Sequence, residues 1–488
     1  MRLLFASSEV FPLAKTGGLA DVSASLPSAL AALGHEVWVA LPAYPAARAA
    51  LDASRSLGPV PGLSGTTLVG GRLPGTELPV VLVDAPSLFA RPGGPYGDAS
   101  GRDWPDNAQR FHGFARALCA IALDRAGLGW RPDLVHCNDW QTGLVPALLS
   151  RETRRPATVF TIHNQAYQGW FDRAQFDALD LPEAWWTPEA LEFYGGFSFL
   201  KAGLVFADQL TTVSPTYARQ LLEPEHGCGL DGLLRHRRDD FTGILNGIDE
   251  EVWNPATDPY LASPYGGATV DTGKRANKVA LQRELGLPAT EQVPLLGLVG
   301  RLVEQKGIDL IAEVIETWRD HPVQWVLLGT GERRWEERLR KLAADRPDRV
   351  AVRIGYDEGL AHRIEAGADF FLMPSRFEPC GLNQMYSQRY GAIPVVHRTG
   401  GLTDTVVDVF ARHDGEGMAA TGLVFDEPTA AALALALERG LSLYRDPAAW
   451  QALRRNAMAG DFSWRRSAEQ YLAVYRRALV DAAGVAHG

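Results

Sequence analysis

The feature that most constrains this chain is an alternation of short apolar runs with stretches of helical periodicity, which continues through almost all of its 488 residues. Helical candidates such as 29–33 and 111–126 lie between the runs. Strands that alternate with helices predict an open parallel α/β sheet. In the first half, four runs have the length of buried parallel strands: residues 37–41, 80–83, 134–137 and 158–162.

The alternation pauses over residues 250–275, where Pro, Gly, Asp and Tyr predict a loop. It then restarts with a helix expected at 308–318 and with strands at 295–300, 325–328, 350–354, 370–373 and 393–396. A chain of this length is too long for a single core. We therefore predict an α/β fold of two doubly wound, Rossmann-like domains, residues 1–247 and 248–460, followed by a helical tail at 461–488.

Composition and charge exclude several classes of function. The net charge of −10 is spread along the chain without blocks, which argues against nucleic-acid or anionic-membrane partners. No apolar stretch approaches 18 residues, and the N-terminus does not have the pattern of a signal peptide. The four cysteines form no Cys-x-x-Cys pair, so neither a disulfide framework nor a zinc site is implied. We expect a cytoplasmic protein.

A glycine pair follows the first apolar run, in the order Lys15-Thr16-Gly17-Gly18. A strand, a glycine pair and a helix can present bare N–H groups to an anion. Lys15 adds a positive charge, and Asp21 can accept hydrogen bonds from hydroxyls, so the loop suits a sugar phosphate. The alternative is a tight turn with a salt-bridged lysine. The segment recurs in the second half as residues 399–404, which suggests a similar loop there.

Two cations follow the strand that opens the second half. Arg301 and Lys306 lie where ligands of such sheets bind, at the carboxyl end of a strand. Cations at a helix N-terminus oppose the helix dipole, and this favours an external anion such as a diphosphate. The alternative is a solvated helix N-terminus.

A dense group of functional residue types follows the predicted strand at 370–373. We expect Glu378-Pro379 to begin a helix, with the Glu378 carboxylate accepting hydrogen bonds from sugar hydroxyls or stabilising positive charge at a reacting carbon. Cys380 beside a helix start could be reactive, but we favour a packing role.

Two strands of the first half end in polar residues. His136 to Trp140 and Thr161 to Gln165 supply His, Asp, Asn and Trp side chains, which suit a polyhydroxyl ligand. No Asp-x-Asp occurs in the chain, so we expect no metal-held diphosphate. Lys15, Arg301 and Lys306 would neutralise a leaving group instead.

Taken together, these motifs closely resemble the glycogen and starch synthase family, which comprises retaining glycosyltransferases of the GT-B fold, with two such domains facing a deep cleft. The resemblance runs in order over about residues 1 to 465. It is carried by segments 15–22, 103–107, 136–140, 163–165, 246–249, 300–302 with 306–307, 374–382 and 399–402.

The resemblance implies transfer of glucose from ADP-glucose to the non-reducing 4-hydroxyl of an α-1,4-glucan, with retention and without metal or cofactor. It implies catalytic roles for Glu378, His163 and Asp21. It places Glu378 at the donor glucose, Asp21, His163 and Asn164 at the donor sugar or acceptor, Tyr96 and Asp139 on the acceptor side, and Tyr356 near the adenine. Lys15, Gly18, Arg301 and Lys306 would hold the diphosphate. Further substrate-binding positions are Gly17, Asn246, Cys380, Gly381, Leu382, Thr399 and Gly400.

One departure concerns related retaining enzymes, which have a second Glu eight positions after the first. Here that position is Tyr386, as is typical of the glycogen synthase branch. The first strand begins at once, whereas plant starch synthases have N-terminal extensions, and this favours a bacterial glycogen synthase. The helix after Trp464 is expected to return to the first domain. Two alternatives stay open: another GT-B enzyme, such as an epimerase or a different glucosyltransferase, and a non-catalytic carbohydrate-binding protein.

Overall fold

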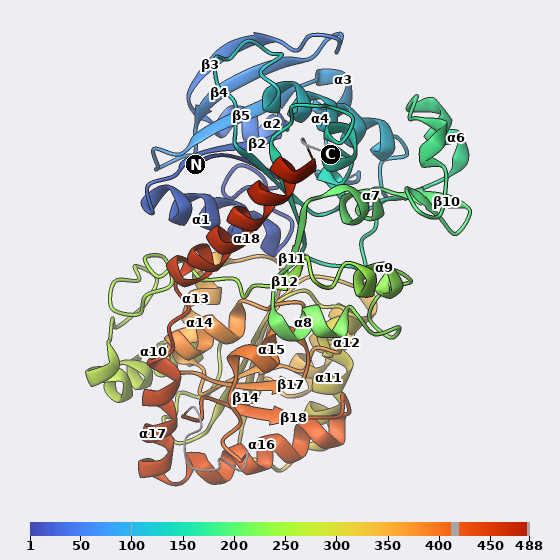
Figure 1. The fold of residues 1–488 in the computed structure, drawn as a ribbon. Coiled ribbons are helices and arrows are strands. Elements are labelled where there is room, and N and C mark those ends of the chain that lie inside the picture. The colour runs from blue at the N-terminus through green and yellow to red at the C-terminus, as the bar shows by residue number, and fades with distance from the viewer. Residues whose placement is uncertain (99, 411–418, 486–488) are drawn as a thin grey trace. The chain divides into compact units, whose positions relative to one another are not determined.

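The computed structural model describes residues 1–98, 100–410 and 419–485 (Figure 1). The chain divides into two compact units. Unit 1 comprises Met1–Gly247 with Trp464–Gly488, and unit 2 comprises Ile248–Ser463. Each unit contains one large sheet with parallel strands and helices, so the predicted α/β class is confirmed.

Unit 1 contains a nine-stranded sheet in the order β12-β11-β7-β6-β1-β2-β5-β4-β3. Strands β3 and β4 are antiparallel, contrary to the purely parallel sheet that we predicted. The connection from β3 to β4 is short, and such a connection allows only antiparallel pairing, since a parallel crossover needs a dozen or more residues. The strands are β1 Arg2–Ala6, β2 Glu36–Pro42, β3 Asp52–Pro59, β4 Thr67–Arg72, β5 Pro79–Asp84, β6 Leu134–Asn138, β7 Ala157–Ile162, β11 Gln209–Thr212 and β12 Phe241–Gly243.

A small antiparallel sheet that the sequence did not predict also belongs to unit 1, in the order β8-β10-β9. Its strands are β8 Trp170–Phe171, β9 Glu192–Phe193 and β10 Gly196–Ser198. The helices of unit 1 are α1 Gly18–Ala32, α2 Pro45–Ala50, α3 Pro86–Phe89, α4 Asn107–Ala122, α5 Leu144–Leu149, α6 Arg173–Ala178, α7 Phe199–Phe206, α8 Pro215–Gln220, α9 Asp231–His236 and α18 Trp464–Val485, with 3-10 turns η1 Trp140–Thr142 and η2 Glu183–Trp185.

Helix α18 packs on unit 1 although the whole of unit 2 separates it in sequence from the rest of unit 1. It contacts α1, β7 and β11, and Figure 1 shows it running beside α1. The Tyr475 hydroxyl lies 2.8 Å from Nδ1 of the buried His136 on β6. Gln209 on β11 donates to the Asp481 carboxylate at 2.8 Å. The helix is therefore held by polar contacts as well as by apolar packing.

Unit 2 contains a six-stranded sheet in the order β15-β14-β13-β16-β17-β18, in which every pairing is parallel, as predicted. The strands are β13 Leu295–Val299, β14 Gln324–Gly329, β15 Val350–Ile354, β16 Phe370–Met373, β17 Ile393–His397 and β18 Leu423–Phe425. Its helices are α10 Val270–Glu284, α11 Ile308–Thr317, α12 Arg333–Asp345, α13 Glu358–Gly367, α14 Asn383–Arg389, α15 Gly400–Thr405, α16 Ala430–Tyr444 and α17 Pro447–Met458, with 3-10 turns η3 Gly267–Thr269 and η4 Glu304–Lys306.

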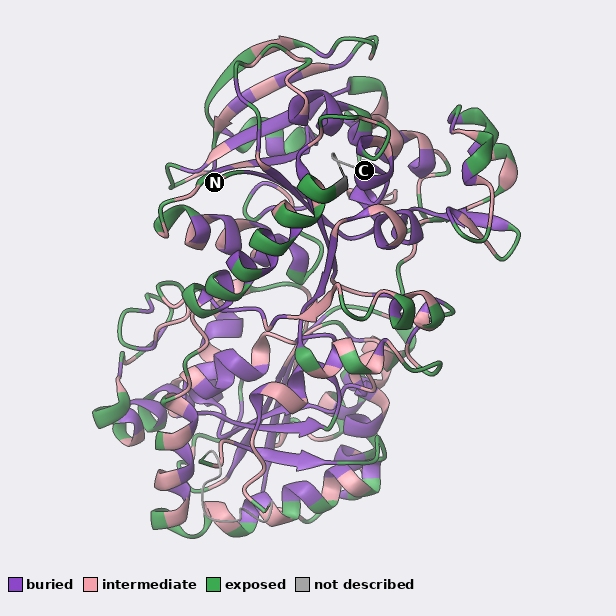
Figure 2. Ribbon diagram, viewed as in Figure 1, coloured by how far each residue is buried: buried purple, intermediate pink, exposed green. Residues whose placement is uncertain are grey.

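The core of unit 2 lies on both faces of this sheet. Phe370 and Leu372 of β16 pack in one cluster with apolar residues of α11 and α16. Phe371 and Met373 pack in a second cluster with residues of α10 and α13. Successive residues of a strand point to opposite faces, so a continuous apolar run is what a sheet covered on both sides requires. Figure 2 shows β17 and β18 of this sheet as buried.

The expected loop over 250–275 is shorter than predicted. A 3-10 turn begins at Gly267, and α10 begins at Val270. The first turn of α10, Asp271 to Arg275, is polar and basic, so its sequence resembles a loop. The helix is nevertheless amphipathic, and its buried face includes Lys274 and Lys278. None of the helices among the described residues is long and apolar enough to cross a membrane.

The contact between α18 and β6 gives a stability prediction. The Tyr475→Phe variant should lower the free energy of unfolding by about 1–3 kcal/mol, because Nδ1 of the buried His136 loses its hydrogen-bond partner. Calorimetry measures this as a lower Tm. Tyr194→Phe is the control, since that ring is 79% exposed. Equal Tm values for the two variants would show that the contact contributes nothing.

Candidate functional site

The glycine loop of unit 1 is organised by Glu9, a residue that we did not select from the sequence. The buried Glu9 carboxylate accepts hydrogen bonds from the amide and the hydroxyl of Thr16, and from the Gly17 amide at 3.1 Å. The prediction that this loop presents bare N–H groups is therefore wrong for Thr16 and Gly17. Because α1 begins at Gly18, the amides of its first turn, from Gly18 onward, have no partner within the helix.

Lys15 makes the ion pair that we had kept as the alternative for this loop. Its Nζ lies 2.8 Å from the Asp21 carboxylate in the first turn of α1. The two side chains are 32% and 26% exposed, so solvent and ligand can reach both. An exposed pair of this kind contributes little to stability. Each partner is therefore available to a competing ion at little cost to the fold.

Tyr96 belongs to the same hydrogen-bonded group. Its hydroxyl donates to Glu9 at 2.5 Å and lies 2.8 Å from the Ser8 hydroxyl. Burial, with the charge of Glu9, raises the pKa of Tyr96 well above its usual value, so the phenol stays protonated. Tyr96 thus joins the segment after α3 to the end of β1.

A second group forms where β6 and β7 end. Oδ1 of Asp139 accepts hydrogen bonds from the amides of His163, at 2.7 Å, and Asn164, at 3.4 Å. Asp139 has φ of 57°, an uncommon conformation for a residue other than glycine. Burial raises the pKa of Asp139 to about 7, although the two amides favour the charged form. The predicted residues Asp139, His163 and Asn164 therefore lie together.

The His163 ring is fixed from the neighbouring strand. Its Nε2 lies 2.9 Å from Oδ1 of Asn138, the last residue of β6. Burial lowers the pKa of His163 to about 3, so the ring is neutral near pH 7. It can therefore take part in hydrogen bonds but does not supply a positive charge. Asn246, also predicted, is buried, and its Oδ1 has no hydrogen-bond partner among the described residues.

In unit 2 the central contact joins two predicted residues. Lys306 Nζ lies 2.5 Å from the Glu378 carboxylate, which also accepts a hydrogen bond from the Ser375 hydroxyl at 2.9 Å. The Glu378 side chain is only 8% exposed, whereas that of Lys306 is 23% exposed. Arg301, which precedes Lys306 in the sequence, is exposed. Its guanidinium donates a hydrogen bond to the Gln305 side chain at 3.1 Å. Both cations follow β13, as predicted.

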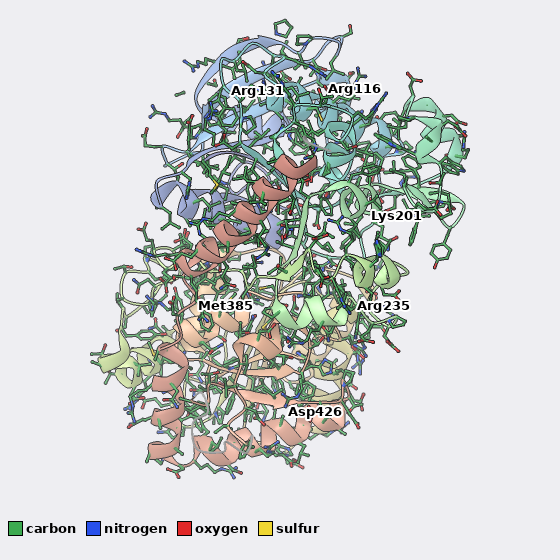
Figure 3. The ribbon with its side chains drawn as sticks, in the orientation of Figure 1. Arg116, Arg131, Lys201, Arg235, Met385 and Asp426 are labelled. Carbon is green, nitrogen blue, oxygen red and sulfur yellow. The ribbon has the colours of Figure 1, made fainter. Side chains whose placement is uncertain are left out.

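The prediction that Glu378-Pro379 begins a helix is wrong. Helix α14 begins only at Asn383. Gly381, which has φ of 73°, interrupts the segment because a left-handed residue cannot belong to a right-handed helix. Cys380 is buried, Leu382 precedes the first helical residue, and Met385 (labelled in Figure 3) lies within α14. Glu378 therefore sits in a loop between β16 and α14.

The second copy of the glycine motif lies against this loop. Gly401 donates its amide to the carbonyls of Glu378 and Pro379 at 3.1 and 3.2 Å. A Cβ at Gly400 would overlap the Glu378 carbonyl, so only glycine allows this approach. Thr399 is the residue before α15. The neighbouring His397 ring lies between the carbonyls of Ser375, at 2.8 Å, and Asp426 (Figure 3), at 3.1 Å. These contacts fix the backbone that carries Glu378.

The other predicted residues of unit 2 have different surroundings. Tyr356, which follows β15, is 73% exposed, and its hydroxyl donates to the Glu358 carboxylate. Tyr386, at the position of the missing second Glu, stacks on Trp253 with ring centroids 3.8 Å apart. That position therefore serves packing, and Glu378 is the carboxylate of this loop.

Unit 2 thus brings two cations and one carboxylate to the carboxyl ends of β13 and β16, where ligands of parallel sheets bind. This arrangement suits a phosphorylated sugar, because the cations can meet phosphate charge and the carboxylate can accept hydroxyl hydrogen bonds. Within the described residues, no group of three or more His, Cys, Asp or Glu side chains could hold a metal ion.

Comparison with known proteins places these features in a family. The model described as the starch synthase catalytic domain matches residues 2–236, and that of glycosyl transferases group 1 matches residues 285–457. Glycogen synthase 1 of Methylococcus capsulatus is 56% identical over 98% of this chain and 97% of its own length. Glycogen synthase of Cellvibrio japonicus is also 56% identical, over 97% of this chain and 98% of its own length.

Among solved structures, the catalytic domain of starch synthase IV from Arabidopsis thaliana, bound to ADP and acarbose, has a TM-score of 0.88 at 35% identity. The match covers 98% of this chain and 99% of that one. Two Rossmann-like units with cations and a carboxylate at strand ends define a GT-B hexosyltransferase. The chain belongs to the glycogen and starch synthase family.

Asp139 gives a pH prediction. Its folded pKa of about 7 exceeds its usual value of 3.8, so between these pH values the folded state binds the proton and the unfolded state does not. The contribution of Asp139 to stability therefore falls as pH rises from about 4 through 7, by at most about 4 kcal/mol. Asp139→Asn should match the wild type near pH 4 and have the higher Tm at pH 8.

The matched control is Asp239→Asn, because the Asp239 side chain is 94% exposed. Its difference in Tm from the wild type should not change with pH. A constant difference for Asp139→Asn as well would contradict the raised pKa of Asp139.

Proposed function

We propose that this enzyme transfers glucose from ADP-glucose to the 4-hydroxyl at the non-reducing end of an α-1,4-glucan, with retention of anomeric configuration. The ion pair between Lys306 and Glu378 supports this assignment most directly. It holds a cation that can take up the charge of a leaving diphosphate next to a carboxylate that can stabilise positive charge at the anomeric carbon. The ADP bound to the Arabidopsis relative supports the choice of nucleotide.

In the proposed donor complex, Arg301 and Lys306 bind the diphosphate, and Glu378 faces the glucose. The Tyr356 ring suits contact with the adenine base of the donor, because the ring is exposed and follows the end of β15. Cys380, Gly381, Leu382, Thr399 and Gly400 contribute mainly through their backbone, because that segment carries Glu378. In unit 1, Lys15 with Gly17 and Gly18 contributes to diphosphate binding, and Asn246 to substrate binding.

Asp21, His163, Asn164, Tyr96 and Asp139 are assigned to the sugar and acceptor. A neutral His163 can accept a hydrogen bond from a sugar hydroxyl, or donate one, according to its tautomer. Glu9 acts as a positioning residue, since it holds the backbone of Thr16 and Gly17.

The route to retention follows from the carboxylates. Double displacement needs a carboxylate nucleophile. Both candidates are ion-paired, Asp21 with Lys15 and Glu378 with Lys306, which reduces their nucleophilicity. We therefore propose front-face transfer. The bond from the anomeric carbon to the diphosphate breaks, and the oxygen of the acceptor 4-hydroxyl bonds to that carbon on the same face. An oxygen of the departing diphosphate accepts the proton of this hydroxyl.

The activity is tested by incubating the enzyme with ADP-glucose or UDP-glucose, with and without glycogen, in the presence of EDTA. We expect ADP release equal to the glucose added to glycogen, dependent on glycogen and faster than UDP release. Equal or faster reaction with UDP-glucose would refute the donor assignment. An isomerised sugar nucleotide would indicate an epimerase, and glucan binding without turnover a binding protein. Loss of activity that Mg²⁺ restores would refute the metal-free proposal.

Glu378→Gln should lower kcat by about a hundredfold or more while ADP binds at least as tightly, because the amide frees Lys306 from its ion pair. Steady-state kinetics and ADP titration measure the two effects separately. Glu427→Gln is the control, since Glu427 is an exposed glutamate of the same unit. An unchanged kcat for Glu378→Gln would remove Glu378 from the catalytic residues.

A further inference from the structure

The first turn of α13 carries a carboxylate beside the exposed ring that we propose faces the nucleotide base. Glu358 is the first residue of α13, and Tyr356 lies two residues before it, after the end of β15. The Tyr356 hydroxyl donates a hydrogen bond to the Glu358 carboxylate. Tyr356 is 73% exposed, and the Glu358 side chain is 35% exposed. A ligand can therefore reach the ring together with the carboxylate at its hydroxyl end.

His362 holds this carboxylate from the next turn of the helix. Residues 358 and 362 are four positions apart, so their side chains share one face of α13. Nε2 of His362 lies 3.6 Å from Oε1 of Glu358, and the two form an ion pair when the ring is protonated. His362 is itself held, because its Nδ1 lies 2.7 Å from the Asp258 carboxylate. The Glu358 side chain is therefore held at two points, by Tyr356 and by His362.

Packing around His362 fixes the direction of its ring. The side chain is 1% exposed and stacks on Trp253, with ring centroids 3.9 Å apart and 10° between the ring planes. Asp258 also accepts a hydrogen bond from the Tyr390 hydroxyl at 2.5 Å. Burial lowers the pKa of His362, but the contacts with Asp258 and Glu358 together raise it by more, so the pKa lies above its usual value. These contacts favour the charged ring, which attracts Glu358.

A carboxylate beside a base is a selective acceptor. An ionised carboxylate accepts hydrogen bonds, about four at most, and donates none. The exocyclic amines of adenine and cytosine donate, whereas guanine and uracil carry a carbonyl oxygen at the corresponding position, which only accepts. A carboxylate that meets this position therefore attracts adenine and cytosine and repels guanine and uracil.

We propose that Glu358 selects the nucleotide, by accepting a hydrogen bond from the exocyclic amine of an adenine base that lies against the Tyr356 ring. The Tyr356 hydroxyl and His362 position its carboxylate. This role rests on the proposed function, because it takes ADP as the nucleotide of the donor. ADP-glucose and UDP-glucose carry the same diphosphate and the same glucose, so the residues assigned to those groups cannot distinguish the two donors. Glu358 supplies the distinction.

Glu358 could instead serve only α13, because the helix dipole favours an acidic residue in the first turn. Such a structural role would affect every nucleotide alike, whereas base selection acts only on a nucleotide that carries the amine. Purine riboside 5′-diphosphate is ADP without its 6-amino group, with the same ring system, ribose and diphosphate. Calorimetric titration of the full chain with each nucleotide gives two Kd values, and their ratio separates the two roles.

The wild type should bind ADP about tenfold more tightly than purine riboside 5′-diphosphate, because the second nucleotide lacks a hydrogen bond to a charged group. Glu358→Met removes the acceptor but keeps a side chain of similar length, so the two Kd values should become equal. Glu337→Met is the matched control, since the Glu337 side chain on α12 is 56% exposed. This control should keep the wild-type ratio.

Two further variants test the positioning of the carboxylate. Tyr356→Phe keeps the ring but removes the hydroxyl that donates to Glu358. His362→Gln removes the charge that faces Glu358 from the next turn. Each variant leaves the carboxylate in place and releases it at one point, so each should give a ratio between those of the wild type and Glu358→Met.

A preference for ADP that disappears in Glu358→Met supports base selection. Equal Kd values in the wild type would overturn it, and so would a Glu358→Met variant that binds both nucleotides more weakly at an unchanged ratio. An unchanged ratio in both Tyr356→Phe and His362→Gln would overturn the positioning of Glu358. Release of ADP from ADP-glucose tests the proposed function separately. Full activity with equal Kd values would contradict base selection alone, whereas a lack of ADP binding would contradict both.

Discussion

The structure depends on one constraint, which is that a parallel strand covered by helices on both faces can present polar groups only at its ends. In unit 2, alternate residues of β16 belong to two apolar clusters, so this strand has no solvated face. Its polar residues, Asp369 and Glu378, therefore lie before and after it. Glu378 and Asp369 lie toward opposite edges of the sheet for this reason.

Buried carboxylates organise the loops at these edges. Glu9 accepts hydrogen bonds from the glycine loop, and Asp139 accepts those of the chain after β7. Glu378 is itself held by Ser375 and Lys306. Glu9 and Asp139 thus each fix a backbone segment that would otherwise have only water as partner. A binding loop held in this way loses less conformational entropy when a ligand arrives.

Unit 2 contains ion pairs of two kinds, one partly exposed and one buried. The pair Lys306–Glu378 is partly open to solvent, so a ligand can compete for either partner. Lys278 and Asp369 are almost completely buried, with side chains 3% and 5% exposed, and removing Asp369 would leave the buried Lys278 without its ion-pair partner. The first arrangement suits reversible binding. The second suits a fixed framework that joins α10 to the start of β16.

The sequence by itself determined the α/β class, the parallel strands of unit 2 and the strand-end location of Lys306, Glu378, Asp139 and His163, because strand-length apolar runs and their polar ends are local patterns. Only the tertiary structure decided which groups meet. The hydrogen bond from the Gly17 amide to Glu9 and the stacking of Tyr386 on Trp253 depend on groups that are not neighbours in the sequence. The late start of α14 is a local event, but Gly381 reveals it only through its left-handed backbone.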